Sequence, residues 1–237
     1  MTLIIVLVVS FLPLAAYVAY LSRSGTRPFS RSMTGALWGL AAVLAASLAE
    51  AALSPFFSAK LAASPALKSA LDAFLRVSLV EECAKFFAVA LIARSGAESG
   101  RGSVNRAEPV ESDGSVNWIS HERATLALAV LVALSFAAFE NLFYGIRDPG
   151  SLTARSLLAL PVHVAATMVS CLAFVRGFRG GRYLLVSCAL HASFNLLMAS
   201  GFPFVFAGFT LVAVLALVAM NLWLKSGSDS GSAGGEA

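Results

Sequence analysis

Hydrophobic residues occur along this chain in long blocks that are separated by short polar stretches. A helix that crosses a membrane needs about 20 mostly apolar residues, because each residue adds only about 1.5 Å of length. About seven blocks reach this length, and we expect each of them to be a membrane-spanning helix. They cover residues 3–21, 33–55, 71–94, 124–145, 154–176, 182–200 and 203–225. The pattern therefore predicts an all-α fold, a polytopic transmembrane helical bundle of about seven spans.

The polar stretches predict how the rest of the chain is organised. Residues 56–65 are too few to cross a membrane and suggest a re-entrant or interfacial piece. Residues 95–123 mix serine, glycine, asparagine and both signs of charge, which is typical of a flexible cytoplasmic loop. We expect residues 1–225 to form one transmembrane domain, with its motifs between 71 and 200, and residues 226–237 to be a disordered tail.

Composition and charge agree with a membrane protein. The chain is 58% hydrophobic and 13% charged, with a mean hydropathy of +0.81, which leaves too little polar surface for a soluble globule. Lys and Arg fall mainly in alternate loops, and such residues are retained in the cytoplasm. We therefore expect a multi-pass protein of a bacterial cytoplasmic membrane, with the N-terminus outside and the C-terminus in the cytoplasm. The net charge of +4 follows from this bias, so the lipid bilayer is an expected partner and nucleic acid is not.

Charged residues inside one predicted span call for an explanation. An ionisable side chain at mid-membrane costs at least about 2.5 kcal/mol on insertion scales, yet the stretch S-L-V-E-E-C-A-K-F-F carries Glu81, Glu82 and Lys85. Glu81 and Lys85 are four residues apart, so an ion pair between them is expected. Glu82 lies about 100° round the helix, and one carboxylate therefore needs another partner. Two adjacent acids that share a proton suit one of them to act as a general base.

Three later predicted spans carry the other polar groups. They are Glu140 and Asn141 in F-A-A-F-E-N, His163 shortly after Pro161, and His191 with Asn195 in L-H-A-S-F-N. At about 1.5 Å per residue, the acids and imidazoles lie about 8 to 15 Å from the outer ends of their helices. They share one depth band, and we expect them to meet in one site.

These motifs resemble those of a known family. E-E-C-A-K fits E-E-x-x-K, F-A-A-F-E-N fits F-x-x-x-E-N, and two later spans each supply a histidine, the last within H-A-S-F-N. Over residues 81–195 the chain resembles the PrsW family of intramembrane proteases, which is related to the CAAX prenyl endopeptidases. The resemblance implies cleavage of a membrane-anchored, single-pass protein, such as an anti-sigma factor in envelope-stress signalling. It implies as catalytic residues Glu81, Glu82, Glu140, His163, His191 and Asn195, supported by Lys85, Phe136 and Asn141.

The chemistry of peptide hydrolysis suggests roles for these residues. It needs a base for the attacking water, a group that stabilises the oxyanion and an acid for the leaving amine. Our hypothesis makes Glu81 or Glu82 the base and lets His191 and Asn195 donate hydrogen bonds to the oxyanion. A second hypothesis makes His163, His191 and Glu140 the ligands of a divalent metal such as zinc. The H-E-x-x-H signature is absent, so metal-dependent and glutamate-only mechanisms both stay open.

Simpler explanations apply to several of these residues one at a time. A single histidine inside a membrane ordinarily makes an interhelical hydrogen bond. Glu50 is either a further member of the site or a residue near the outer interface, and we favour the interface. We expect Arg76 to extend outward from its span. Two other functions, a proton-coupled transporter and a non-catalytic membrane scaffold, are also compatible with buried Glu, Lys and His. Acids on two spans and histidines on two others favour the protease.

Overall fold

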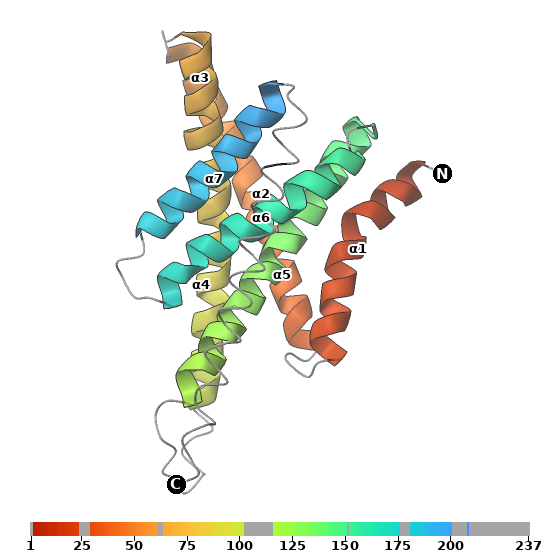
Figure 1. Cartoon of the computed structure of the whole chain (residues 1–237), viewed down its shortest axis with the longest axis vertical. Coiled ribbons are helices and arrows are strands. Elements are labelled where there is room, and N and C mark those ends of the chain that lie inside the picture. The colour runs from red at the N-terminus through yellow and green to blue at the C-terminus, as the bar shows by residue number, and fades with distance from the viewer. Residues whose placement is uncertain are drawn as a thin grey trace, which may run out of the picture.

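The computed structural model describes residues 2–23, 29–60, 64–101, 116–150, 152–175, 181–200 and 208. Every regular element in these ranges is helical, which confirms the all-α prediction. The elements are α1 (Thr2–Arg23), α2 (Phe29–Lys60), α3 (Pro65–Leu71), η1 (Asp72–Ser78), α4 (Leu79–Arg101), α5 (Val116–Arg147), α6 (Leu152–Val175) and α7 (Gly181–Ser200) (Figure 1).

Within the described part of the chain, four stretches of helix are long and apolar enough to cross a membrane. They are Leu3–Arg23, Ser32–Phe57, Ala124–Arg147 and Arg155–Leu172. The predicted spans at 71–94 and 182–200 are helical but are not among these four, so about seven spans is not confirmed. The predicted span at 203–225 and the tail at 226–237 lie outside the described residues, apart from residue 208.

Two predicted boundaries are wrong. The stretch predicted as a re-entrant or interfacial piece is helical at its start, because α2 continues through Pro55 to Lys60. Part of the predicted loop at 95–123 is also helical, since α4 continues to Arg101 and α5 begins at Val116. Hydropathy marks where a chain leaves lipid, but a helix with internally satisfied backbone groups can extend into water beyond that point.

Helices α3, η1 and α4 form one continuous rod along the longest axis of the molecule (Figure 1). The rod begins at Ser64, whose hydroxyl accepts a hydrogen bond from the backbone N–H of Leu67 at 3.3 Å, and Pro65 occupies the first turn. Its middle section, Asp72–Ser78, is a π-helix. Such segments are rare and occur frequently at functional sites. This one ends three residues before Glu81.

Helix α5 forms the centre of the bundle and contacts α1, α2, α4 and α6. Its contact with α2 is especially close because Gly35 and Gly39 have no side chains. A Cβ atom added at Gly39 would lie 2.5 Å from Cβ of Ser135 and 2.8 Å from the carbonyl oxygen of Val132. The Ser135 hydroxyl also donates to the carbonyl of Ala36 at 2.6 Å. Small residues at this contact fix α2 against α5, as is usual between membrane helices.

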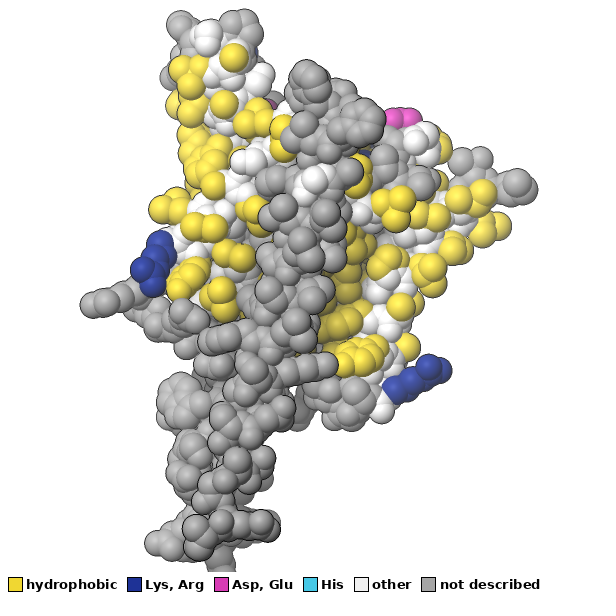
Figure 2. Space-filling model, viewed as in Figure 1, with side chains coloured by type: hydrophobic (Ala, Val, Ile, Leu, Met, Phe, Trp, Pro, Cys, Tyr) yellow, Lys and Arg dark blue, Asp and Glu magenta, His cyan; other side chains and the backbone are white. Residues whose placement is uncertain are grey.

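The outside of the bundle is apolar. Figure 2 shows hydrophobic side chains over much of the described surface on one face, with charged side chains at only a few points. Large apolar side chains with more than half of their surface exposed include Leu3, Ile4, Leu12, Leu37, Leu48, Leu157 and Leu185. Water would not favour this surface, whereas lipid chains would cover it at no cost. The protein is therefore an integral membrane protein.

Candidate active site

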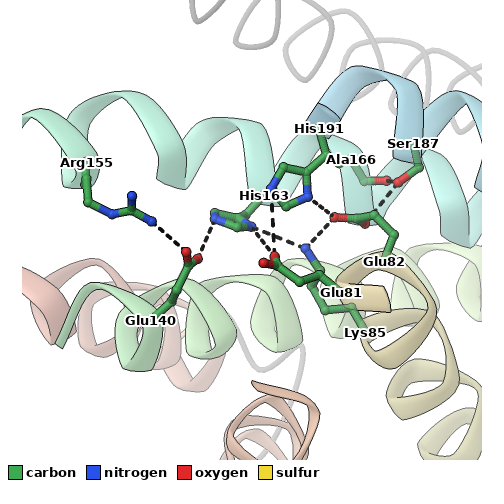
Figure 3. Close-up of polar contacts among 9 residues, drawn as sticks. All are labelled: Glu81, Glu82, Lys85, Glu140, Arg155, His163, Ala166, Ser187 and His191. Atoms are coloured by element: carbon green, nitrogen blue, oxygen red, sulfur yellow. Dashed lines mark hydrogen bonds and ion pairs between the residues drawn. The ribbon is translucent and has the colours of Figure 1, made fainter. Parts of the chain in front are cut away.

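Four helices bring their polar side chains to one place inside the bundle. Helix α4 supplies Glu81, Glu82 and Lys85, α5 supplies Glu140, α6 supplies His163 and α7 supplies His191 (Figure 3). All but Glu140 are buried, and Glu140 is close to buried, with a side chain that is 14% exposed. The sequence predicted that these groups would meet, and the structure brings them together.

Glu82 is the most completely bonded of the carboxylates. Lys85 donates to its Oε1 atom in an ion pair between two side chains that are 0% exposed. Nδ1 of His191 lies 2.9 Å from the same oxygen, and the Ser187 hydroxyl lies 2.9 Å from Oε2. The expected ion pair between Glu81 and Lys85 does not form, because the lysine turns to the carboxylate three residues away instead. Glu82 thus ties α4 to α7 and has little capacity left to bind water.

Each histidine places one ring nitrogen against a carboxylate, on the side of the ring that is turned away from Glu81. Nε2 of His163 lies 2.9 Å from Oε2 of Glu140, and Nδ1 of His191 lies 2.9 Å from Oε1 of Glu82. Between a carboxylate and a neutral imidazole, the nitrogen atom in each contact must carry the proton, because two lone pairs would repel at this distance. In a neutral ring the other nitrogen is then unprotonated and can act as an acceptor or as a metal ligand.

The two available nitrogens converge on Glu81. Oε2 of Glu81 lies 4.0 Å from Nδ1 of His163 and 3.8 Å from Nε2 of His191. This oxygen is buried and has no hydrogen-bond partner among the described residues. A buried carboxylate oxygen without a partner is energetically costly. We therefore expect a further group, outside the contacts described so far, to bind this oxygen.

A metal ion fits this position. Glu81, His163 and His191 each offer one ligand atom, and these atoms lie within 4.8 Å of one another. In a tetrahedral zinc site the ligand atoms are about 3.4 Å apart, so only small shifts are needed. The predicted set contained Glu140 in place of Glu81. In the structure Glu140 instead contacts Nε2 of His163, the ring nitrogen that points away from Glu81. In metal sites a carboxylate at this position orients the histidine that binds the metal.

Lys85 and Phe136, the predicted supporting residues, both contact His163. Nζ of Lys85 lies 3.2 Å from Nδ1 of His163 and 4.7 Å from the centre of the Phe136 ring. The Phe136 and His163 rings also pack together, with their centroids 5.8 Å apart. A buried lysine is therefore held by a carboxylate, an imidazole and an aromatic face.

Two other predicted residues lie apart from this network. Asn141 is buried, and its amide donates to the Ser156 hydroxyl at 3.4 Å, which joins α5 to α6. Asn195 is half-buried, and the hydrogen bonds of Glu82 run to Lys85, Ser187 and His191 instead. The oxyanion role of Asn195 stays a prediction.

Several further residues that contact the site were not predicted from the sequence. Nη2 of Arg155 lies 2.6 Å from Oε1 of Glu140, and its guanidinium stacks 3.7 Å above the Tyr144 ring. Arg155 lies at the start of a predicted span, where a charged residue is ordinary. Its position in the sequence therefore did not indicate a buried charge. Ser187 could have been found, because it precedes His191 by four residues and so shares its helix face.

A cavity of about 660 Å³ leads to the site between α2 and α5. Glu81 and Glu140 line it, together with Glu50 and Arg76. Glu50 thus lies on the same cavity as the site, and the outward positions expected for Glu50 and Arg76 stay predictions.

A helical membrane bundle with buried acids and imidazoles beside a cavity has the groups that an intramembrane hydrolase needs. A model of the PrsW family of intramembrane metalloproteases matches residues 27–223, most of the chain, and the protein belongs to this family. No curated protein and no solved structure shows significant similarity to it. The family match makes the protein an intramembrane peptidase rather than a transporter or a scaffold. It also includes α2, where the motif comparison found nothing.

Proposed function

We propose that this peptidase hydrolyses a peptide bond in or next to the membrane-spanning segment of a single-pass membrane protein. The observation that carries the proposal is the carboxylate of Glu81. Its Oε2 atom is buried and has no hydrogen-bond partner among the described residues, and Glu81 lines the same cavity as Glu140. Two carboxylates on one cavity suit the binding and deprotonation of a water molecule beside a substrate carbonyl.

The residues around Glu81 suit a divalent metal such as zinc, which we propose as the cofactor. Glu81, His163 and His191 would hold it, and it would supply Lewis-acid polarisation of the substrate carbonyl. Glu140 and Glu82 fix the tautomers of the two histidines by contacting their outer nitrogens. These contacts keep the inner nitrogens unprotonated, as metal ligands must be.

Proton transfer is assigned to Glu140. Its Oε1 atom is held by Arg155 at 2.6 Å, and its Oε2 atom lies 2.9 Å from Nε2 of His163. In our proposal the carboxylate takes the proton of the attacking water and returns it to the nitrogen of the leaving amine. Arg155 keeps the carboxylate at the cavity wall while the proton moves.

The substrate that we propose in particular is an anti-sigma factor of envelope-stress signalling, which the motif resemblance implies. We place the enzyme in a bacterial cytoplasmic membrane with its N-terminus outside, because Lys and Arg are concentrated in alternate loops. Reporter fusions at each end, one active only in the cytoplasm and one only outside it, test this orientation.

The proposed activity is tested by co-expression with a panel of single-pass membrane reporters that includes anti-sigma factors. The wild-type chain is expected to shorten at least one reporter. Glu81→Gln, Glu140→Gln, His163→Ala and His191→Ala should each reduce cleavage by at least about 100-fold, as losses of single catalytic groups commonly do. Asp148→Asn is the control, because it removes an exposed carboxylate outside the site. Full cleavage by Glu81→Gln at equal protein level would contradict the proposal.

Metal dependence needs a separate measurement. Purified wild-type protein should contain close to one divalent ion per chain by elemental analysis, and His163→Ala and His191→Ala should contain much less. Exhaustive chelation should stop cleavage and added zinc should restore it. A metal-free sample with full activity would show instead that Glu81 acts as a general base without a metal.

A further inference from the structure

The wall of the cavity that α2 provides is more polar than a membrane helix requires. Val43, Ser47, Glu50 and Ser54 all line the cavity, at spacings of four, three and four residues. These spacings place them on one face of the helix. A membrane helix without a polar ligand would keep an apolar face there, since each polar group carries an insertion cost. This face is directed at the same cavity that Glu81 and Glu140 line.

Glu50 and Arg76 lie next to each other on the wall of this cavity but do not form a hydrogen bond with one another. Nη1 of Arg76 lies 3.9 Å from Oε2 of Glu50, which is beyond hydrogen-bond distance. The other side of the guanidinium is occupied, because Nε and Nη2 donate to the Asp72 carboxylate. Both side chains remain partly exposed, at 23% for Arg76 and 22% for Glu50. One donor and one carboxylate acceptor are thus available beside the active site.

A peptide segment that is cut inside a membrane needs such partners. Its scissile bond must leave the helix before water can attack, which frees backbone N–H and C=O groups. In lipid each unsatisfied group costs several kcal/mol. A binding site for an unwound segment must therefore offer both donors and acceptors, in addition to apolar surface for the side chains.

From these observations we propose that Glu50 and Arg76 are substrate-binding residues, and that the cavity between α2 and α5 holds the unwound segment of the substrate. Glu50 accepts hydrogen bonds from peptide N–H groups, and Nη1 of Arg76 donates to a peptide carbonyl. The apolar part of the wall, which includes Phe143 and Ile146, contacts the substrate's side chains. This inference rests on the proposed function and assigns α2 the role of substrate recognition.

Kinetics on a reporter that the wild-type chain cleaves provide the first test. Glu50→Gln and Arg76→Gln should each raise KM about 10-fold or more while kcat stays within about threefold, because each removes a hydrogen bond to a charged group that forms on binding. Glu50→Asp and Arg76→Lys keep the charge and should recover part of the affinity. A purely structural pair would behave differently: the variants would unfold at lower temperature with an unchanged KM, and that result would overturn the proposal.

Cross-linking provides the second test. It distinguishes a failure of the proposed binding site from a failure of the proposed activity. Ser47→Cys in the Glu81→Gln background should form a disulfide, under mild oxidation, with a cysteine placed next to the reporter's cleavage site. Ala45→Cys is the matched control, because Ala45 is exposed about 200° round α2 from Ser47. The Glu81→Gln parent gives the background from native cysteines. Equal cross-linking at both positions would refute the docking site even if the reporter is cleaved, whereas a reporter that Glu81→Gln still cleaves would refute the proposed function.

Discussion

Nδ1 of His163 lies 3.2 Å from Nζ of Lys85, so the ring nitrogen that faces Glu81 already has a hydrogen-bond donor beside it. Lysine has no acceptor atom, and Nδ1 must therefore be the acceptor in this contact. The contact explains how a metal-free site keeps its histidine in place. It also means that a metal ion and Lys85 compete for one nitrogen atom.

This competition predicts an unusual effect of Lys85→Met. The unfolding temperature of the metal-free variant should fall, because removing one partner of a buried ion pair costs about 3 to 5 kcal/mol. Added zinc should then raise the unfolding temperature more in the variant than in the wild type, since the competing cation is gone. Thermal unfolding of both proteins at matched zinc concentrations measures this. An equal zinc-induced shift in both would show that Lys85 does not restrict metal binding.

Glu81 and Glu82 are adjacent in sequence and should respond in opposite ways to the same substitution. Glu81→Gln removes a buried charge without a hydrogen-bond partner on Oε2, so we expect the unfolding free energy of metal-free protein to change little or to rise. Glu82→Gln breaks the buried pair with Lys85 and should lower it by about 3 kcal/mol.

Denaturant or thermal unfolding of the two variants in the same detergent gives the comparison. Cleavage is expected to be lost in Glu81→Gln even though that variant is well folded. If Glu81→Gln proved the less stable of the two in metal-free protein, the assignment of Glu82 to structure and Glu81 to chemistry would be wrong.

The helices and the convergence of the site residues could be predicted from free-energy costs: the cost of exposing long apolar blocks to water, and the cost of placing charged groups in lipid. About 20 apolar residues in a row have no other stable use than crossing a membrane. Charges inside such blocks need one another, so Glu81, Glu140, His163 and His191 had to converge or be lost. Hydropathy does not fix the rotation of one helix against another, however. For that reason the sequence left two positions open for Glu50, one beside the site and one at the outer interface.

The ion pairs within the site also depend on how the helices are rotated against one another, which the sequence does not give. From sequence, Lys85 could pair with Glu81 or with Glu82, four and three residues away. The choice is made by α7, because Ser187 and His191 surround Glu82 and so turn the lysine toward it. The proposed metal ligands differ from the predicted ones for the same reason. With Lys85 turned to Glu82, Glu81 is the carboxylate that faces Nδ1 of His163 and Nε2 of His191.

The glycine contact between α2 and α5 should determine stability. Gly39→Ala places a methyl group 2.5 Å from Cβ of Ser135 and 2.8 Å from a backbone oxygen, so the helices must separate. We expect a loss of about 1 to 3 kcal/mol, together with weaker cleavage because α2 forms one wall of the cavity. Gly181→Ala is the matched control, since its added methyl group would meet no atom within 4 Å. Equal unfolding temperatures for the two variants would exclude a role for this contact.

Arg155 should act on catalysis through Glu140 rather than on folding alone. Its guanidinium holds Oε1 of Glu140 at 2.6 Å and stacks on Tyr144, a planar arrangement that lysine cannot reproduce. We expect Arg155→Gln to lower kcat about 10-fold or more with a small change in KM, because the carboxylate loses its orientation. Arg155→Lys should recover only part of this loss. Steady-state cleavage of a purified reporter measures both constants, and metal content should stay at the wild-type level, since Arg155 touches no proposed ligand. A fall in metal content equal to the fall in kcat would show that Arg155 stabilises the metal centre instead.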